Sequence, residues 1–326
     1  MDIGDIFRDG DELNISEERK HEINMLLMEW EARFHSGKAK NITLEEFNKI
    51  CAVRKEEFKK LAEMYEKKMI FAISDIHGNL QAMERVVNRV LHYLINGNSK
   101  LIMLGDYIDR GRESYECLKL AYDLQQKFGK DKVIVLKGNH EAWFIDFLKG
   151  NGYDWLAEDE KYRTTRTFLT EIQMEELSKI YQREEVIEYM MKTIKNNHKE
   201  LLAWVNKLPL YYETDSQIFV HAGVDEEIPK EEMEWCTLGT GEWTFLGKYP
   251  PTKGKFFKDI IAGHVAAKQV AGDKSFDGIY FDGESHFYID GSGGDRQSLL
   301  CLAYDEEEKT YYDYKMDGTF KLLKKN

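Results

Sequence analysis

Two amphipathic patterns occupy the start of the chain. In each, apolar residues recur at three- and four-residue steps, which places them on one face of a helix. The first pattern contains Ile23, Leu26, Leu27, Trp30 and Phe34, and the second contains Phe47, Ile50, Val53, Phe58, Leu61 and Met64. We predict a helical N-terminal extension over residues 1–68, folded as a hairpin against the rest of the protein. A docking surface for a partner is the alternative.

From Met69 onwards, short apolar strands alternate with helical patterns. Residues 69–74, 100–104 and 132–136 are strand-like, whereas residues 80–95, 113–128 and 140–149 are helix-like. This order predicts a largely parallel sheet covered by helices. Residues 160–206 are rich in Glu, Lys, Met and Leu, and they predict a helical insertion or cap that ends before Pro209.

After Pro209 the chain returns to strands, which we predict at residues 217–220, 259–262, 278–281, 286–289, 299–304 and 311–315. The last four follow one another without helices between them, a pattern typical of an antiparallel meander. We therefore expect an α/β domain over residues 69–326, which contains the helical insertion.

Composition narrows the classes of function. With 326 residues, 42% of them hydrophobic, the chain can bury one large core. The net charge of −13 argues against nonspecific binding to nucleic acid or an anionic membrane. Cys51, Cys117, Cys236 and Cys301 form no CxxC pair. Because the sequence shows neither a signal peptide nor an apolar membrane span, we expect a cytoplasmic protein without a membrane partner.

Five polar stretches stand where predicted strands end. In open α/β sheets, ligands bind outside the carboxyl ends of the strands, so we expect these stretches to converge. They are residues 74–79, 105–111, 138–141, 221–223 and 263–264.

The side chains of these stretches form a set of metal ligands. Asp75 and His77 lie two residues apart, and an extended backbone would point both the same way, towards one ion. The carboxylate of Asp106 can bridge two cations about 3.5 to 4 Å apart. The remaining ligands, for the second ion, are Asn139, His221 and His264. This mixture favours two divalent ions, manganese first, with iron or zinc as alternatives to it.

Three more residues complete a catalytic hypothesis. His140 follows the ligand Asn139 directly and can face a substrate, where it would protonate a leaving oxygen. Asp109 can hold that imidazole in its working tautomer. The guanidinium of Arg110 suits two phosphate oxygens, and two cations would keep the site locally positive within an acidic protein.

The string GDxxDRG at 105–111, followed by GNHE, HAG and GH, resembles the calcineurin-like metallophosphoesterase superfamily, specifically bacterial PPP-type serine/threonine protein phosphatases. The resemblance extends from Met69 to about Tyr314, with Ser74 in place of the usual first glycine. It implies a four-layer αββα sandwich of two mixed sheets flanked by helices. It also implies the six metal ligands above, and it gives His140, Asp109 and Arg110 the roles of acid, orienting carboxylate and phosphate-binding arginine.

We therefore expect a hydrolase that attacks phosphomonoesters, with phosphoserine or phosphothreonine on protein first, through a metal-bridging hydroxide. Alternatives are a dinucleoside polyphosphate hydrolase of the diadenosine tetraphosphatase type, a phosphodiesterase, or a binding module without catalysis. Glu141 favours the phosphatase, because diadenosine tetraphosphatases usually show GNHD at this motif.

One departure from the family pattern concerns phosphate binding. PPP enzymes present a second arginine near the segment between HAG and GH, but no arginine occurs between Arg183 and Arg296. We consider Lys248, Lys253, Lys255 and Lys268 as substitutes. In the same segment, Trp235 and Trp243 are predicted to pack in the core, with a substrate platform as the alternative.

Overall fold

The structure is a computed structural model that describes residues 67–96, 98–151, 155–156, 159, 162–227, 236–292 and 299–325. The predicted N-terminal helices, and with them the docking alternative for residues 1–68, lie outside the described residues except for Lys67 and Lys68. Trp235 also lies outside them.

The first sheet has six strands in the order β11-β10-β9-β1-β2-β3. Strand β1 pairs in parallel with β2, β2 pairs in parallel with β3, and β9 joins the other edge of β1 in antiparallel orientation. The strands are β1 (Met69–Ile73), β2 (Lys100–Met103), β3 (Val133–Val135), β9 (Leu302–Asp305), β10 (Thr310–Tyr314) and β11 (Phe320–Lys325).

The second sheet has five strands in the order β4-β5-β6-β8-β7. Strands β5, β6 and β8 are parallel, and β4 and β7 close the two edges in antiparallel orientation. The strands are β4 (Tyr211–Glu213), β5 (Gln217–Val220), β6 (Asp259–Ala266), β7 (Tyr280–Phe281) and β8 (His286–Asp290).

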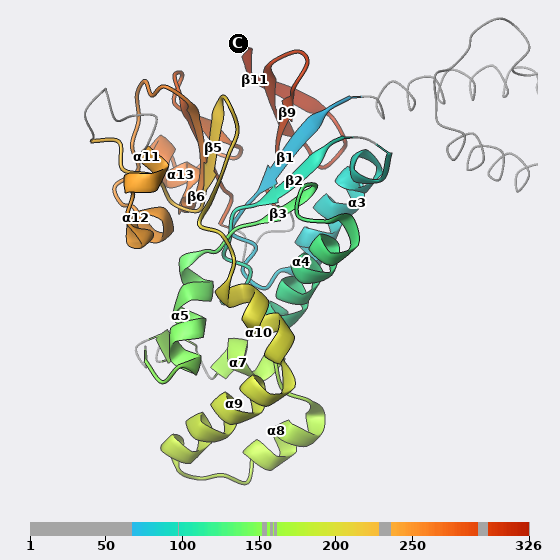
Figure 1. Ribbon diagram of the computed structural model, residues 1–326, viewed down its shortest axis with the longest axis vertical. Coiled ribbons are helices and arrows are strands. Elements are labelled where there is room, and N and C mark those ends of the chain that lie inside the picture. The colour runs from blue at the N-terminus through green and yellow to red at the C-terminus, as the bar shows by residue number, and fades with distance from the viewer. Residues whose placement is uncertain are drawn as a thin grey trace, which may run out of the picture. The chain divides into compact units, whose positions relative to one another are not determined.

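Helices cover the outer face of each sheet (Figure 1). On the first sheet these are α3 (Leu80–Asn96) and α4 (Ser114–Phe128), and on the second they are α11 (Cys236–Gly239), α12 (Glu242–Gly247) and α13 (Ala267–Ala271). Helix α5 (Asn139–Leu148) begins at the end of β3. The described residues therefore form the predicted αββα sandwich of two mixed sheets.

The central strands are apolar on both faces because both faces are buried. Ile70 and Ala72 of β1 face the second sheet, in a shared core that includes Phe219 and Phe287. Phe71, between them, points the other way and packs against Tyr93 of α3, with 4.9 Å between ring centroids. A continuous apolar run in the sequence thus supplies two cores, one on each side of the sheet.

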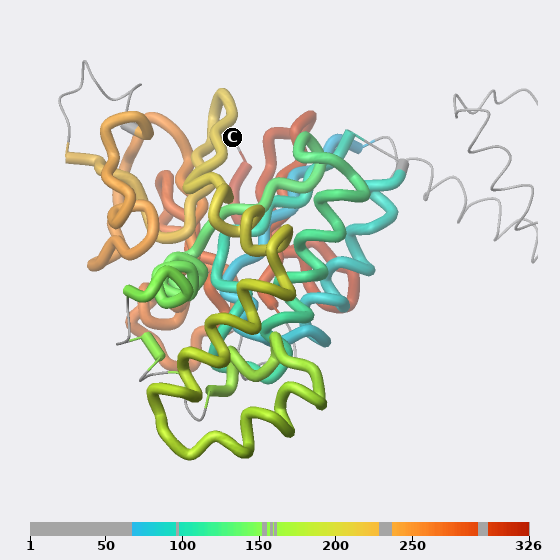
Figure 2. Tube along the Cα trace, turned by 60° about the horizontal axis from the view of Figure 1, so that its bottom comes forward, coloured from blue at the N-terminus to red at the C-terminus, as the bar shows by residue number. Residues whose placement is uncertain are grey.

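Within the segment 160–206, where a helical insertion is predicted, the described residues 162–206 contain four helices. They are α7 (Arg163–Thr167), α8 (Glu171–Leu177), α9 (Arg183–Asn197) and α10 (Lys199–Asn206). Helices α8 and α9 project away from the sheets in both views (Figures 1 and 2). No helix in the described part of the chain has both the length and the apolar character needed to cross a membrane.

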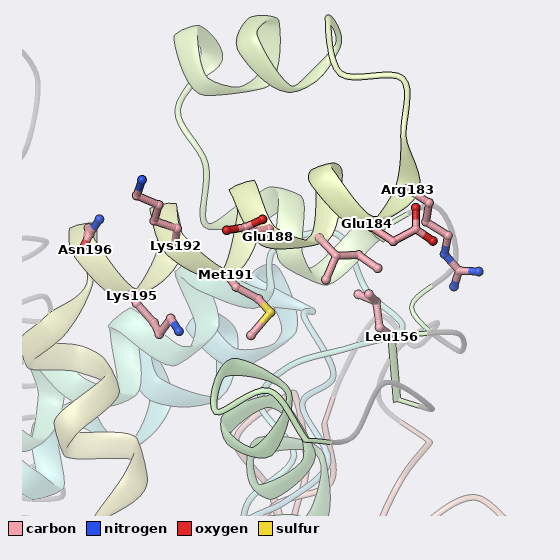
Figure 3. A pocket seen from close by; sticks show the side chains of 9 residues that line it. Leu156, Arg183, Glu184, Glu188, Met191, Lys192, Lys195 and Asn196 are labelled. Atoms are coloured by element: carbon pink, nitrogen blue, oxygen red, sulfur yellow. The ribbon is translucent and has the colours of Figure 1, made fainter.

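A groove of about 770 Å³ lies along α9 (Figure 3). Leu156, Ile187 and Met191 supply its apolar part, and acidic and basic side chains of α9 stand beside them. None of its described lining residues belongs to the predicted metal and catalytic set.

The prediction that the last four strands form one antiparallel meander is wrong. The hairpin β7–β8 belongs to the second sheet, whereas β9, β10 and β11 form an antiparallel set on the first. The chain therefore changes sheets between β8 and β9. Strands β4 and β11 were not predicted, because their residues are half-exposed or exposed and give no clear alternation.

Candidate metal centre

The loops at the carboxyl ends of the strands are held together by backbone hydrogen bonds. After β1 and β2, the N–H of Asp75 donates to the carbonyl of Gly105 at 3.2 Å, and the N–H of His77 donates to that of Asp106 at 2.9 Å. After β5 and β6, the N–H of Gly263 donates to the carbonyl of His221 at 2.8 Å. Pairing between neighbouring strands thus continues into the predicted site.

Two further bonds join the sheets to each other at this end. The N–H of His264 donates to Oδ2 of Asp75 at 3.0 Å, and Nδ1 of His221 donates to the carbonyl of Leu104 at 2.9 Å. The site therefore lies where the ends of both sheets meet, and α5 starts there (Figure 1).

Left-handed backbone is concentrated in this region. Nine described non-glycine residues have positive φ, and six of them belong to the predicted site: Asp75, His77, Asp106, Asp109, Arg110 and His264. Such conformations cost energy for residues with a Cβ, so they persist where the surroundings hold them. The expected extended backbone at Asp75 and His77 is wrong, because their φ angles are 54° and 49°. Their imidazole and carboxylate meet through two turns, not through strand alternation.

Two glycines permit the close approach of the loops. A Cβ on Gly138 would lie 2.1 Å from Oδ1 of Asp106, and one on Gly263 would lie 2.3 Å from Oδ2 of Asp75. Both distances are shorter than any real contact, so larger residues would displace the carboxylates.

Asp106 is common to two clusters that can hold a metal ion. One cluster consists of His77, Asp106 and His140, and the other of Asp106, His221 and His264, each with ligand atoms within 4.8 Å of one another. Oδ2 of Asp106 lies 3.7 Å from Nε2 of His77 and 3.4 Å from Nε2 of His221. The carboxylate thus stands between the two groups of imidazoles, as a bridging ligand would.

A missing hydrogen bond supports the fit of a cation. Nε2 of His77 is buried and has no hydrogen-bond partner among the described residues. It faces Oδ1 of Asp75 at 3.9 Å and the Asp106 carboxylate at 3.7 Å, distances too long for hydrogen bonds. An unsatisfied buried nitrogen is costly, and a cation shared with both carboxylates would satisfy it. Nδ1 of His77 donates to the carbonyl of Ile108 at 2.9 Å, which leaves Nε2 as the ligand atom.

In the second cluster, the side chain of Asn139 lies within hydrogen-bond distance of both imidazoles. Its Oδ1 lies 2.8 Å from Nε2 of His221 and 3.1 Å from Nδ1 of His264. His264 is placed by an irregularity in β6, whose register against β8 shifts between Ala262 and Ala266. Bulges of this kind re-aim a side chain next to a functional site.

The four site histidines divide into two pairs. Burial lowers the pKa of His77 to about 4 and that of His264 to about 4. For His221 and His140 burial also acts downwards, but Asp106 and the other nearby carboxylates outweigh it and raise each pKa to about 9. In the absence of a cation, these two imidazoliums offset the buried carboxylates.

His140 is held by Asp109. Nδ1 of His140 donates to Oδ2 of Asp109 at 2.5 Å, and Nε1 of Trp155 donates to the same oxygen at 2.7 Å. The other carboxylate oxygen accepts from Oγ1 of Thr164 at 2.6 Å. Nε2 of His140 is therefore directed towards Asp106, 3.7 Å away. Sequence reasoning paired His140 with Asp109 but missed Trp155 and Thr164, which lie in or beside the insertion.

Glu141 is a structural residue that the sequence did not reveal. Its carboxylate is fully buried, and it accepts the N–H groups of Asp106, Tyr107, Ile108 and Gly138 at 2.8 to 3.3 Å. Burial, followed by repulsion from Asp106, raises the pKa of Glu141 to about 7. Because its side chain faces the protein backbone, the choice of Glu at this position does not contact a substrate directly.

The lysines considered as phosphate ligands are partly engaged elsewhere. Nζ of Lys248 bonds to Oε1 of Glu226 and to the carbonyl of Val224, both at 2.6 Å, and Nζ of Lys253 donates to the carbonyl of Val270 at 2.8 Å. Trp243 has 57% of its surface exposed, so the prediction of core packing is wrong for it. It stands on the short helix α12, which buries Phe245 and Leu246 instead.

The two-sheet fold and the clustered carboxylates and imidazoles, which could hold metal ions, are those expected of a metallophosphoesterase. The sequence model of the family described as calcineurin-like phosphoesterase matches residues 68–285. The chain belongs to that family, which confirms the resemblance seen in its motifs.

Individual relatives match shorter segments. The chain is 29% identical over 131 residues to the serine/threonine-protein phosphatase PP1-delta of Caenorhabditis elegans, covering 39% of this chain and 39% of that protein. It is 37% identical over 86 residues to an uncharacterized protein of the same organism, covering 24% of this chain and 34% of that one. The chain thus spans well under half the length of these curated relatives.

Among solved structures, a cold-active protein tyrosine phosphatase is similar in fold, with a TM-score of 0.51 and 17% identity over 81% of this chain and 83% of that one. This likeness confirms the predicted fold class.

Proposed function

We propose that the protein is a metal-dependent phosphomonoesterase. The observation that carries the proposal is the position of Asp106, which is shared by two clusters of potential ligands and lies 3.7 Å from the acid candidate His140. Asp75, His77 and Asp106 would hold one divalent cation, and Asp106, Asn139, His221 and His264 the other. Such cations, when bound, acidify a water molecule and offset the charge of a phosphate.

Three residues of the chain would supply the other catalytic roles, which are proton donation, orientation of the acid and phosphate binding. His140 donates a proton from Nε2 to the leaving oxygen, since its Nδ1 is committed to Asp109. Asp109 keeps the imidazole in that tautomer, helped by bonds from Trp155 and Thr164. Arg110, whose side chain is exposed at the site, binds the phosphate oxygens of the substrate.

His140 also appears in one of the two ligand clusters, in place of Asp75. We assign it to the acid because its Nδ1 is bonded to Asp109 at 2.5 Å, which leaves Nε2 to carry a proton beside the metal centre. Asp75 is the better ligand, since its carboxylate is buried beside Nε2 of His77 and is held by the N–H of His264.

Hydrolysis of p-nitrophenyl phosphate with added manganese tests the class of reaction. We expect Asp106→Asn to abolish the activity and His140→Ala to lower kcat by about 10²-fold. Full activity in both variants would refute the assignment. A purified protein that is folded but inactive with manganese, iron and zinc would favour a binding module instead.

Phosphoserine or phosphothreonine on protein is the proposed substrate, supported by the match to a segment of PP1-delta. The test compares phosphoserine, phosphothreonine and phosphotyrosine peptides with diadenosine tetraphosphate and bis-p-nitrophenyl phosphate. A preference for the dinucleotide would replace the protein phosphatase by a dinucleoside polyphosphate hydrolase. Cleavage of the diester alone would exclude a monoesterase.

Three finer expectations belong to the same proposal. The imidazole, amide and carboxylate donors suit manganese, with iron or zinc as alternatives. We also propose a cytoplasmic location, consistent with the cysteine usage, and a partner-docking role for residues 1–68. Metal analysis of the purified protein, localisation of a tagged full chain, and pull-down with and without residues 1–68 test these points.

A further inference from the structure

The loop that carries Asp109 and Arg110 is strained. Both residues have left-handed backbone, with φ angles of 72° and 62°. Two consecutive residues of this kind cost roughly 1 to 2 kcal/mol each, so the loop keeps its shape only while neighbours hold it. Because the Arg110 side chain is exposed, packing does not fix it, and its direction depends on the backbone from which it starts.

Helix α7 bonds to this loop at two points and to the first turn of α4 at a third. Nη1 of Arg163 donates to the carbonyl of Arg110 at 2.7 Å. Oγ1 of Thr164 donates to Asp109 at 2.6 Å, and Oγ1 of Thr167 accepts the N–H of Tyr115 at 3.1 Å. One helix of five residues, at the start of the insertion, therefore contacts the loop at Asp109 and Arg110 and also the helix that follows the loop.

The helix is itself fixed in place. The carboxylate of Asp159 accepts the N–H of Thr164 at 2.8 Å and that of Thr165 at 3.2 Å. Thr164 and Thr165 are buried, and Tyr162 enters the helix with a φ of 59°. A rigid α7 can hold a strained neighbour, whereas a mobile one could not.

Arg110 directly follows the orienting carboxylate Asp109, and its own side chain is exposed. Lys248, one of the lysines considered as a substitute for a second arginine, is already bonded to Glu226. The orientation of Arg110 therefore matters more here than in an enzyme with a second arginine in the segment between HAG and GH.

We propose that Arg163 is a positioning residue, which holds the Arg110 carbonyl so that the Arg110 guanidinium points at the substrate phosphate. The helical insertion is then part of the active site and not a separate cap. This inference rests on the proposed phosphoesterase function. Thr164 has a parallel task, because it acts through Asp109 on His140 and not on the phosphate.

The test compares Arg163→Ala with Arg166→Ala, a charge-matched control from the same helix whose side chain is also exposed. With p-nitrophenyl phosphate and manganese, we expect Arg163→Ala to raise KM about tenfold with little change in kcat, and to weaken binding of inorganic phosphate in calorimetry by a similar factor. Thr164→Val should instead lower kcat and leave KM near the wild-type value. Thermal unfolding establishes that each variant is folded.

A double-mutant cycle identifies the route of the effect. If Arg163 acts through Arg110, Arg163→Ala adds nothing to KM or phosphate affinity in an Arg110→Ala background. An Arg163→Ala enzyme that matches Arg166→Ala would overturn the inference, and so would an effect that persists undiminished without Arg110. Both results leave the proposed function intact, whereas a wild-type protein that neither binds phosphate nor hydrolyses any ester would remove that function itself.

Discussion

Glu141 accepts the backbone N–H of Asp106 at 2.9 Å, so one carboxylate at the start of α5 holds the backbone of another that lies between the two ligand clusters. The same oxygen accepts the N–H of Gly138, and its partner oxygen accepts those of Tyr107 and Ile108. Four backbone donors thus converge on a side chain with no exposed surface. The side chain at position 141 therefore affects the metal centre by fixing the backbone of the loop that carries Asp106.

The first prediction concerns that loop. Glu141→Asp shortens the side chain and should leave several buried N–H groups unpaired, at a cost of about 2 to 4 kcal/mol in the free energy of unfolding. We expect weaker manganese binding in calorimetry and unchanged relative rates on monoester and dinucleotide substrates. A change of substrate preference with intact stability would show that residue 141 selects the substrate instead.

The affinity of variants for manganese distinguishes the proposed metal ligands from the proposed general acid. His77→Ala removes the buried Nε2 that lacks a partner, and we expect manganese affinity to fall by at least about tenfold. His140→Ala should change the manganese affinity by less than about threefold, since the imidazole of His140 is bonded to Asp109. Calorimetric titration of both variants into manganese provides the comparison. Equal losses would place His140 among the ligands.

The sequence predicted which loops meet, because the ends of parallel strands share one edge of a sheet. It did not predict how they meet. The left-handed turns at Asp75 and His77, and the bonds from Glu141, depend on contacts between distant segments. Strand β11 was missed because Phe320–Lys325 is a largely exposed edge with three lysines. Trp243 was misplaced because an apolar side chain was assumed to be buried.

General acid catalysis predicts a dependence on the leaving group. A leaving oxygen of high pKa needs a proton in the transition state, whereas p-nitrophenolate needs it less. His140→Ala should therefore lower kcat by a larger factor on phenyl phosphate than on p-nitrophenyl phosphate. Asp109→Asn should show the same trend, because it loosens the imidazole. Equal losses on both esters would assign His140 a role other than proton donation.

A charged network on the second sheet predicts how stability depends on pH. His286 is buried between two carboxylates, with Nε2 2.9 Å from Glu226 and Nδ1 3.0 Å from Asp282, and Lys248 also bonds to Glu226. Burial acts against the charge on His286, but Glu226 and Asp282 outweigh it, so the pKa of His286 is raised above 6.5. Hydrogen bonds and the charges of the partners lower the pKa of Glu226 and of Asp282 despite burial.

These pKa shifts determine how the contribution of the network to stability changes at high pH and at low pH. The contribution of His286 is complete below pH 6.5 and is lost as pH rises through its raised folded pKa, while that of the carboxylates is lost as pH falls through their lowered values. His286→Gln should lower stability at pH 6 by about 1 to 3 kcal/mol and reduce the alkaline loss seen in the wild type. Denaturant unfolding with a chelator present, from pH 5 to 9, measures both effects.

His198→Gln is the control, because the imidazole of His198 bonds to the carbonyl of Phe168 at 2.8 Å and not to a carboxylate. This variant should keep the loss of stability at alkaline pH. A His286→Gln protein with the wild-type pH profile would mean that the network carries no net charge coupling.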